Sequence, residues 1–550
     1  MTLTRSNRIA LGAMAGAAAV LSTAALGTLG GAATAAASQP TASTAAQQSP
    51  HGAGTTLPGG YKHLVVIYEE NHSFDNLYGT WGKVHGQSVD GLAQATTAQR
   101  TQVAQDGTAY GCLPQDDVNL TSPPLGDTCQ DSAHGISASH FTNKPFRIDD
   151  YIKPEDRTCP AEGVYAPNGV LEDSDGAQPG GCTRDLVHRF YQEQYQIDGG
   201  KQDRYTTGSD AVGLTQGGYA TRQLPIYRYL HGRNAPHYVL ADHFFQAAFG
   251  GSFLNHQFLI AARAPLDTSN GADGAKNSVV DTNGMPTSYP QYQATGSVTD
   301  GQLTQKCASD PALDDPLHAC GDYAINTIQP ASAPHGSGAQ LPLIDDAEYP
   351  NIGDRLTEAG VSWKWYSGGW DDAEAGHPGP LFQYHHQPFN YFADYAPGQP
   401  GRKHLEDEST FFSAAKDGHL PAVSFVKPYG AENEHPGYAS EPNGSDHLVH
   451  LLKTISHGPQ ADKTLVVVTY DEFGGQWDHV SPPKVDAWGP GTRIPALVLS
   501  TSLKHSAVDH TTYDTTSILS TIEKSYGLAP LSTRDAAAHS LARAVAAGSK

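Results

Sequence analysis

Short apolar runs that alternate with amphipathic segments are the feature that most constrains the fold of this chain. The runs are rich in Val, Ile, Leu and Tyr, which is typical of buried strands. They span residues 63–68, 238–241, 361–366, 422–426, 465–470 and 494–499. Amphipathic helices are expected between some of them, at 351–359 and 446–456. This alternation predicts an α/β fold whose central, mostly parallel sheet is covered by helices on both faces.

Two loop-rich stretches, at about 97–183 and 267–341, interrupt this pattern and are expected to be insertions. The six cysteines fall in these stretches as three local pairs, which are Cys112 and Cys129, Cys159 and Cys182, and Cys307 and Cys320. Disulfides formed in an oxidising compartment are expected, although the sequence leaves their connectivity open. A zinc site is disfavoured because no C-x-x-C spacing occurs.

The N-terminal residues have the features of a targeting segment. Arg5 and Arg8 precede an apolar run rich in Ala, Leu and Gly, and the stretch up to Ala37 offers small-residue cleavage sites. We therefore expect a signal peptide at 1–37, a disordered leader at 38–60 and one large domain at 61–550. A retained membrane anchor is the alternative, but this run is a weak spanning helix. The protein is expected to be secreted, without stable insertion into a membrane.

The formal net charge of -23 excludes some classes of partner. Nucleic acid is disfavoured because no basic stretch offsets the acidic residues. If such a chain handles anionic phosphate, it must concentrate positive charge locally, and a metal ion with a few histidines would do so.

The first polar cluster, Glu69 to Asp75, directly follows the run at 63–68. Carboxylate and carboxamide oxygens, here of Glu70 and Asn71, are hard ligands for a cation. In parallel sheets such residues gather at the carboxyl ends of strands. The alternative is a helix cap, with Asn71 or Ser73 as the N-cap.

The second cluster follows the run at 465–470 and begins with Asp471 and Glu472. Adjacent carboxylates repel each other unless a cation or proton lies between them, so a metal site is indicated. Gly474 and Gly475 then permit a tight turn, and Asp478-His479 could add a ligand or a supporting pair. The alternative is a solvated acidic turn.

The third cluster places Ser252 behind two glycines, in G-G-S-F-L-N-H. It lacks the G-x-S-x-G pattern of a serine esterase, so a Ser-His-Asp lipase or protease is disfavoured. A metal could instead lower the pKa of the Ser252 hydroxyl and make it nucleophilic.

Together, three ordered motifs resemble the bacterial phosphoesterase family. The motifs are E-N-H-S-F-D-N-L-Y-G, T-Y-D-E-F-G-G-Q-W-D-H-V-S-P-P and G-T-R-I-P. This family holds phosphatidylcholine-type phospholipases C and a branch of acid phosphatases. The resemblance runs from about Tyr61 to near Arg534, and it implies a three-layer α/β/α sandwich similar to that of alkaline phosphatase.

The resemblance also implies roles for individual residues. Glu70, Asn71, Asp471 and Glu472 would form the site of one divalent cation, and Ser252 would be the nucleophile that also contacts it. Oxygen ligands admit Ca, Mg or Mn, whereas nearby histidines would admit Zn or Fe. The phospholipase branch has T-x-P-N-R at the nucleophile, but this chain has S-F-L-N-H, which resembles the acid phosphatase branch.

Three of the 26 histidines are implied to act on the phosphoryl group or the leaving group. His188 precedes a Gly-Gly-Lys segment, and His386 and His435 resemble the pair that contacts phosphate oxygens. His385 could take the place of His386.

The expected function is a secreted, metal-dependent phosphoric-ester hydrolase with a phosphoserine intermediate, acting as an acid phosphatase on monoesters. One alternative is a phospholipase C that cleaves phosphatidylcholine-type diesters. From another class, a non-catalytic secreted protein that binds metal or phosphate is the alternative. A sulfatase is disfavoured because no C-x-P-x-R or S-x-P-x-R motif is present. The oligomeric state stays open.

Overall fold

The computed structural model describes residues 56–115, 120, 124–161, 163–267, 279–281, 285–286, 289–296, 298–299 and 323–550. The expected signal peptide, most of the expected leader, Cys307 and Cys320 lie outside these residues. Leu57 is buried and Pro58–Gly60 forms a 3-10 turn, although these residues were assigned to the expected leader. This turn packs against the last helix, α12 (Ala542–Ser549).

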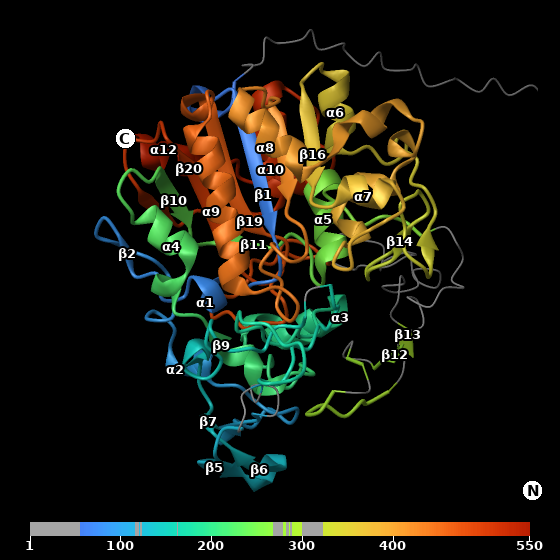
Figure 1. Cartoon of the computed structure of the whole chain (residues 1–550). Coiled ribbons are helices and arrows are strands. Elements are labelled where there is room, and N and C mark those ends of the chain that lie inside the picture. Colours follow the sequence, from blue (N-terminus) through green and yellow to red (C-terminus); the bar gives the residue numbers. More distant parts are fainter. Residues whose placement is uncertain are drawn as a thin grey trace, which may run out of the picture. The chain divides into compact units, whose positions relative to one another are not determined.

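An eight-stranded sheet forms the centre of the domain (Figure 1). Its strands in spatial order are β17 (Leu405–Asp407), β16 (Trp363–Ser367), β18 (Val423–Lys427), β1 (His63–Glu69), β19 (Thr464–Tyr470), β20 (Ala496–Ser500), β10 (His237–Ala241) and β21 (Ala507–Asp509). Only β20 runs antiparallel to its neighbours in this sheet. All six apolar runs become strands, so the predicted α/β fold with a mostly parallel sheet is confirmed.

Helices cover both faces of the sheet. On one face α9 (Glu441–His457) packs between α4 (Pro225–Leu230) and α8 (Glu408–Asp417), and Figure 1 shows α8 and α9 in front of the strands. On the other face α5 (Ser252–Ala261) contacts α10 (Thr516–Tyr526) and α6 (Ile352–Glu358). The helices expected at 351–359 and 446–456 are thus present as α6 and α9.

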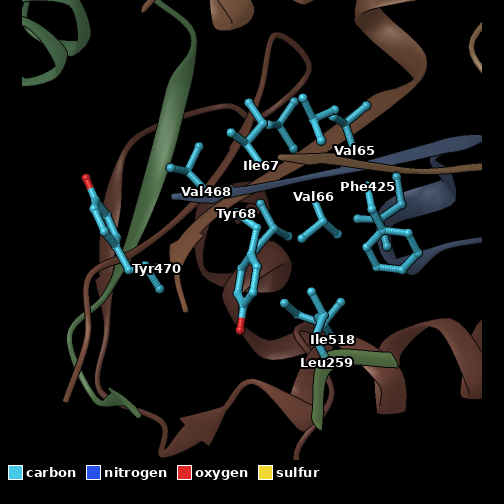
Figure 2. Packing of buried hydrophobic residues seen from close by; sticks show 14 of the residues in the cluster. Val65, Val66, Ile67, Tyr68, Leu259, Phe425, Val468, Tyr470 and Ile518 are labelled. Atoms are coloured by element: carbon cyan, nitrogen blue, oxygen red, sulfur yellow. The ribbon is translucent and has the colours of Figure 1, made fainter. Parts of the chain in front are cut away.

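Strand β1 is buried on both faces, which explains why its sequence is continuously apolar. Val66 and Tyr68 point toward Leu259 of α5 and Ile518 of α10, whereas Val65 lies on the opposite side of the strand (Figure 2). Burial of these side chains fixes the strand at the middle of the sheet, and with it the residues that follow at its carboxyl end.

The remaining elements are short. The helices are α1 (Phe74–Leu77), α2 (Thr97–Arg100), α3 (Phe190–Ile197), α7 (Trp370–Glu374) and α11 (Thr533–Ala537). The strand pairs outside the main sheet are β2 (Lys83–Val84) with β3 (Gln87–Ser88), β4 (Cys112–Leu113) with β7 (Phe141–Thr142), β5 (Cys129–Asp131) with β6 (Ile136–Ser139), β8 (Phe146–Arg147) with β9 (Gly217–Gly218), β11 (Phe244–Phe245) with β22 (Tyr513–Asp514), β12 (Val279–Val280) with β13 (Val298–Thr299), and β14 (Gln329–Pro330) with β15 (Gln340–Leu341).

The first expected insertion contains short paired strands and a small apolar core of its own around Leu113 and Ile148. Two disulfides, Cys112–Cys129 and Cys159–Cys182, close its loops as expected. Such cross-links stabilise segments whose own core is small. Among the described residues, no helix has the length and apolar character needed to cross a bilayer.

One buried carboxylate joins three segments beside the carboxyl edge of the sheet. Glu193 of α3 accepts hydrogen bonds from the backbone N–H groups of Gly250 at 2.6 Å and Thr492 at 2.7 Å. Its oxygens also accept from the Thr492 hydroxyl at 2.8 Å and from Gln246 Nε2 at 2.9 Å. Gln246 Oε1 in turn accepts from the backbone N–H of Phe473 at 2.9 Å. Glu193 and Gln246 therefore tie the 246–250 turn to the segments at 473 and 492.

Replacing Glu193 with Gln should destabilise the protein although the volume hardly changes. The carboxamide –NH2 would face donors that now meet an acceptor, and each buried donor left unsatisfied costs about 1–3 kcal/mol. We expect the free energy of unfolding in urea to fall by about 2–4 kcal/mol. Gln194→Ala, on the partly exposed side of the same helix, is the matched control. Equal stability of E193Q and the wild type would contradict this junction.

Candidate active site

The polar clusters that follow β1 and β19 meet at one edge of the sheet. These strands are parallel neighbours in which Glu69 pairs with Tyr470, so Glu70 and Asn71 emerge beside Asp471 and Glu472. All four side chains are buried. The alternative interpretation of 471–472 as a solvated acidic turn is therefore wrong. The cap interpretation of the first cluster holds for Ser73, whose side chain accepts from the backbone N–H of Asn76 and caps α1.

Ser252 reaches this edge from a different part of the chain. It is the first residue of α5, and its side chain is largely buried. Its Oγ lies 3.3 Å from Glu70 Oε2, 3.4 Å from Asn71 Oδ1 and 3.5 Å from Glu472 Oε1. The hydroxyl thus stands among oxygen atoms contributed by both strand ends.

Asn71 turns sharply after β1, with a φ of 55° that Asn tolerates better than most residues. Its backbone N–H donates to Asp471 Oδ1 at 3.1 Å, which locks the two strand ends together. Gly474 approaches this turn so closely that a Cβ there would lie 2.3 Å from the Asn71 carbonyl oxygen. The glycine after the acidic pair is required by this contact as well as by its own positive φ of 62°.

The carboxylates of Asp471 and Glu472 are crowded in a dry environment. Burial, with the charge of Glu70, raises the pKa of Asp471 well above its ordinary value. Burial, with the charge of Asp471, does the same for Glu472. In both residues the cost arises because a charged form is taken out of water beside other negative charges. A positive ion placed among them would reverse this effect.

Lys427, the last residue of β18, supplies one positive charge to the site. Its fully buried ammonium group contacts Glu70 Oε1 and donates to the Glu69 carbonyl oxygen at 3.2 Å. His386 Nε2 lies 2.9 Å from the same Glu70 oxygen. Burial would raise the pKa of Glu70, but Lys427 and His386 hold it well below its ordinary value. Glu70 is thus held ionised, anchored by one oxygen and facing Ser252 with the other.

His188 and His435 approach Asn71 from the other side. His188 Nε2 lies 3.3 Å from Glu472 Oε1 and 3.5 Å from Asn71 Nδ2, and His435 Nε2 lies 2.8 Å from Asn71 Nδ2. Each ring turns Nδ1 toward a carbonyl oxygen, that of Leu186 at 2.5 Å and that of Pro436 at 2.8 Å. A carbonyl accepts only, so Nδ1 carries the proton and Nε2 is the basic nitrogen. Burial lowers the pKa of both imidazoles, which favours their neutral forms.

The structure brings all the expected site residues together and adds two that the sequence did not single out. His386, rather than the neighbouring His385, contacts Glu70. Lys427 was missed, although it directly follows the apolar run at 422–426 just as the expected residues follow theirs. His256 was missed as well. It lies one helical turn after Ser252, stacks on His386 and places Nδ1 3.7 Å from Asp471 Oδ2.

The donor set fits a divalent cation. Three buried carboxylates surround one hydroxyl, and Lys427 is the single buried ammonium group that contacts them within the described residues. The oxygens of Glu70, Asn71, Asp471 and Glu472 suit Mg, Ca or Mn. Glu70, His256 and His386 also place potential ligand atoms within 4.8 Å of one another, and His256 Nε2 is buried without a hydrogen-bond partner. Because these histidine nitrogens lie beside the oxygen ligands, Zn and Fe are also candidate ions for the site.

A cavity of about 450 Å³ opens beside the nucleophile. The residues that line it include His188, Gly251, Phe253, Asp185, Asp210 and Ile325. The cavity is large enough for a small phosphate ester, and it gives that ester a path to the half-buried His188 and to Ser252.

Several characterised proteins are similar to this chain. A non-hemolytic phospholipase C of Burkholderia pseudomallei is 29% identical over 218 residues, which are 30% of this chain and 30% of that protein. Phospholipase C B of Mycobacterium tuberculosis is 23% identical over 507 residues, or 85% of this chain and 73% of that protein. A solved protein of the alkaline phosphatase superfamily from Vibrio parahaemolyticus has 11% identity and a TM-score of 0.21, covering 33% of this chain and 48% of its own.

The Phosphoesterase family matches residues 61–529, which is most of the sequence. This span begins with β1 and includes Ser252, both acidic clusters and the three histidines that face them. This match does not agree with the alternative function, a non-catalytic protein that binds metal or phosphate. The chain is a phosphoester hydrolase and belongs to the phosphoesterase family.

Proposed function

We propose that this protein hydrolyses phosphomonoesters through Ser252, which becomes phosphorylated during turnover. The observation that carries the proposal is the position of the Ser252 hydroxyl, 3.3–3.5 Å from three oxygen donors of the two strand ends. A serine packed only for structural reasons would not require buried carboxylates on several sides. A nucleophile beside a cation site would require them.

In this proposal Glu70, Asn71, Asp471 and Glu472 hold one divalent cation. When bound, the cation would lower the pKa of the Ser252 hydroxyl and offset the negative charge of the phosphoryl group. Lys427 keeps Glu70 ionised by direct contact, and the Asn71 turn fixes the distance between the strand ends. These residues determine where positive charge is available before substrate arrives.

Ser252 Oγ forms a bond to phosphorus while the bond from phosphorus to the ester oxygen breaks. Ser252 begins α5, whose first backbone N–H groups lack helical acceptors and favour an anion at this end. Water then attacks phosphorus, breaks its bond to Oγ and releases phosphate. The basic Nε2 atoms of His188 and His435 take up the proton of the Ser252 hydroxyl and give it to the leaving alcohol oxygen. They then take a proton from the attacking water and return it to Ser252 Oγ. His386 acts differently, because its Nε2 holds Glu70.

Phosphodiesters of the phosphatidylcholine type are the second candidate substrate. The phospholipases C that resemble this chain favour it, since one of them matches 85% of the chain. The sequence at the nucleophile argues against the diester, because Ser252 and His256 replace the Thr and Arg of the phospholipase motif. The imidazole of His256 cannot replace the guanidinium of that Arg. It is also fully buried and stacked on His386. This difference favours the monoester.

We also propose that the protein is exported. The disulfides Cys112–Cys129 and Cys159–Cys182 support this, because disulfides persist in oxidising compartments. The basic and apolar N-terminal segment expected to be a signal peptide agrees with it.

Replacing Ser252 with Ala should abolish turnover without unfolding the protein. Only one oxygen atom is removed, and the remaining donors still surround the cation site. We expect hydrolysis of p-nitrophenyl phosphate to fall by at least ~1000-fold, because the nucleophile is lost. Ser413→Ala, at an exposed position of α8, should leave the rate unchanged. Retention of more than a few per cent of the rate by S252A would exclude this nucleophile.

Replacing Asp471 with Asn should weaken metal retention. The change removes one negative charge from the buried group and leaves its size intact. We expect the affinity for the activating cation to drop by at least ~10-fold, as measured by metal analysis after dialysis. Asp417→Asn, an exposed change at the end of α8, serves as the control. Full metal occupancy together with unchanged activity in D471N would rule out Asp471 as a ligand.

One panel of activity assays distinguishes the two candidate substrate classes. Metal-stripped protein is supplied with Ca, Mg, Mn, Zn or Fe(II), one at a time, and assayed on p-nitrophenyl phosphate and on phosphatidylcholine vesicles. We expect a single cation to restore activity best and the monoester to have the larger kcat/KM. Faster cleavage of phosphatidylcholine than of the monoester would assign the protein to the diester class instead.

A further inference from the structure

A second group of potential metal ligands lies at the ends of β10 and β21, away from Ser252. Asp242 and His243 follow β10, and His510 follows the parallel strand β21. His243 Nδ1 and His510 Nδ1 both face the same atom, Asp242 Oδ1, at 3.0 Å and 2.8 Å. Strand β20 lies between β10 and β19, which carries the acidic pair of the candidate active site. None of these three residues has a role in the proposed hydrolysis.

His243 has carboxylates at both ring nitrogens. Nδ1 faces Asp242, and Nε2 lies 3.3 Å from Asp90 Oδ2. A neutral imidazole has only one N–H, so both carboxylates are satisfied only by a protonated ring or by a ring whose Nδ1 binds a metal. If Nδ1 instead bound a metal, Nε2–H would donate to Asp90. A carboxylate that holds the far nitrogen of a metal-binding histidine is a frequent arrangement in metal sites.

Asp90 is itself part of a larger buried charge network. Its other oxygen lies 3.2 Å from His479 Nε2, whose Nδ1 is 2.6 Å from Asp75 Oδ2. Arg493 is fully buried and contacts Asp75 and Asp478. Two further carboxylates, those of Asp90 and Asp242, continue from this core toward the surface. Asp75 and Asp478 pair with Arg493, whereas the rings of His243 and His510 face Asp242.

We propose that Asp242, His243 and His510 form a second metal site, which takes a divalent transition metal such as Zn²⁺ or Co²⁺. Two nitrogen ligands and one carboxylate suit these ions better than Ca or Mg. Ligand atoms about 2.1 Å from an ion lie about 3.0 Å apart at right angles and about 3.4 Å apart in a tetrahedral site. The three potential ligand atoms here lie within 4.8 Å of one another, so small movements of the two partly exposed rings would bring them to such spacings. Asp90 holds His243 in place through Nε2.

The exposure of the three residues agrees with this assignment. Asp242 is fully buried, His243 is 24% exposed and His510 is 56% exposed, so an ion could enter from solvent and keep water in its open positions.

Metal counting on single variants tests the site. Chelator-stripped protein is dialysed at pH 8 against micromolar Co²⁺ or Zn²⁺, and bound metal per chain is measured. Cobalt also reports imidazole coordination through its visible absorption. We expect His510→Ala to bind one equivalent less than the wild type, with unchanged hydrolysis of p-nitrophenyl phosphate. His243→Gln should lose the same equivalent.

Two comparisons keep this site distinct from the catalytic one. D471N should lose a different equivalent, so the double variant D471N/H510A should lose both. His457→Ala, at another exposed histidine, should lose none. If H510A and H243Q both bind as much metal as the wild type, the three side chains form only a protonated hydrogen-bonded cluster and the proposal is overturned. If D471N alone retains the full metal content, the result would count against the catalytic metal site and not against this second site.

Discussion

The burial of three carboxylates at the ends of two adjacent parallel strands is the constraint on which the site depends. Glu70 follows β1, and Asp471 and Glu472 follow β19, in a region from which water is largely excluded. The desolvation of each charge costs several kcal/mol unless positive charge lies close by. Lys427 compensates part of this, and a bound cation would compensate the rest. Burial of these carboxylates thus lowers the stability of the fold and creates a place where positive charge is required.

The nucleophile has to meet this group from a separate region of the chain. The 246–250 turn leads from β11 into α5, and Glu193 and Gln246 attach it to the segments after Glu472 and before β20. Because these bonds use backbone N–H groups, the position of Ser252 follows from the path of the chain. Small movements of α3 would therefore move the Ser252 hydroxyl relative to the carboxylates.

Much of this could be predicted from the sequence, for identifiable reasons. Strands buried on both faces are continuous apolar runs, and the carboxyl ends of parallel strands meet, so Glu70 and Asp471 could be expected to converge. Strands β17 and β21 are only three residues long and carry no such signal. Lys427 was missed because a lysine after a strand is usually solvated. Ser252 and the three histidines were indicated by family resemblance, since no local pattern distinguishes them from other serines and histidines.

The central claim is that phosphorus becomes bonded to Ser252 Oγ at the carboxylate edge of the sheet. The most direct measurement is acid quenching of the enzyme during turnover of a phosphomonoester, followed by peptide mass spectrometry. The account requires a phosphoryl group on the peptide that contains Ser252, at a level that rises and falls with turnover. Turnover that leaves the phosphoryl group on His188 or His435, or on no residue of the chain, would contradict it.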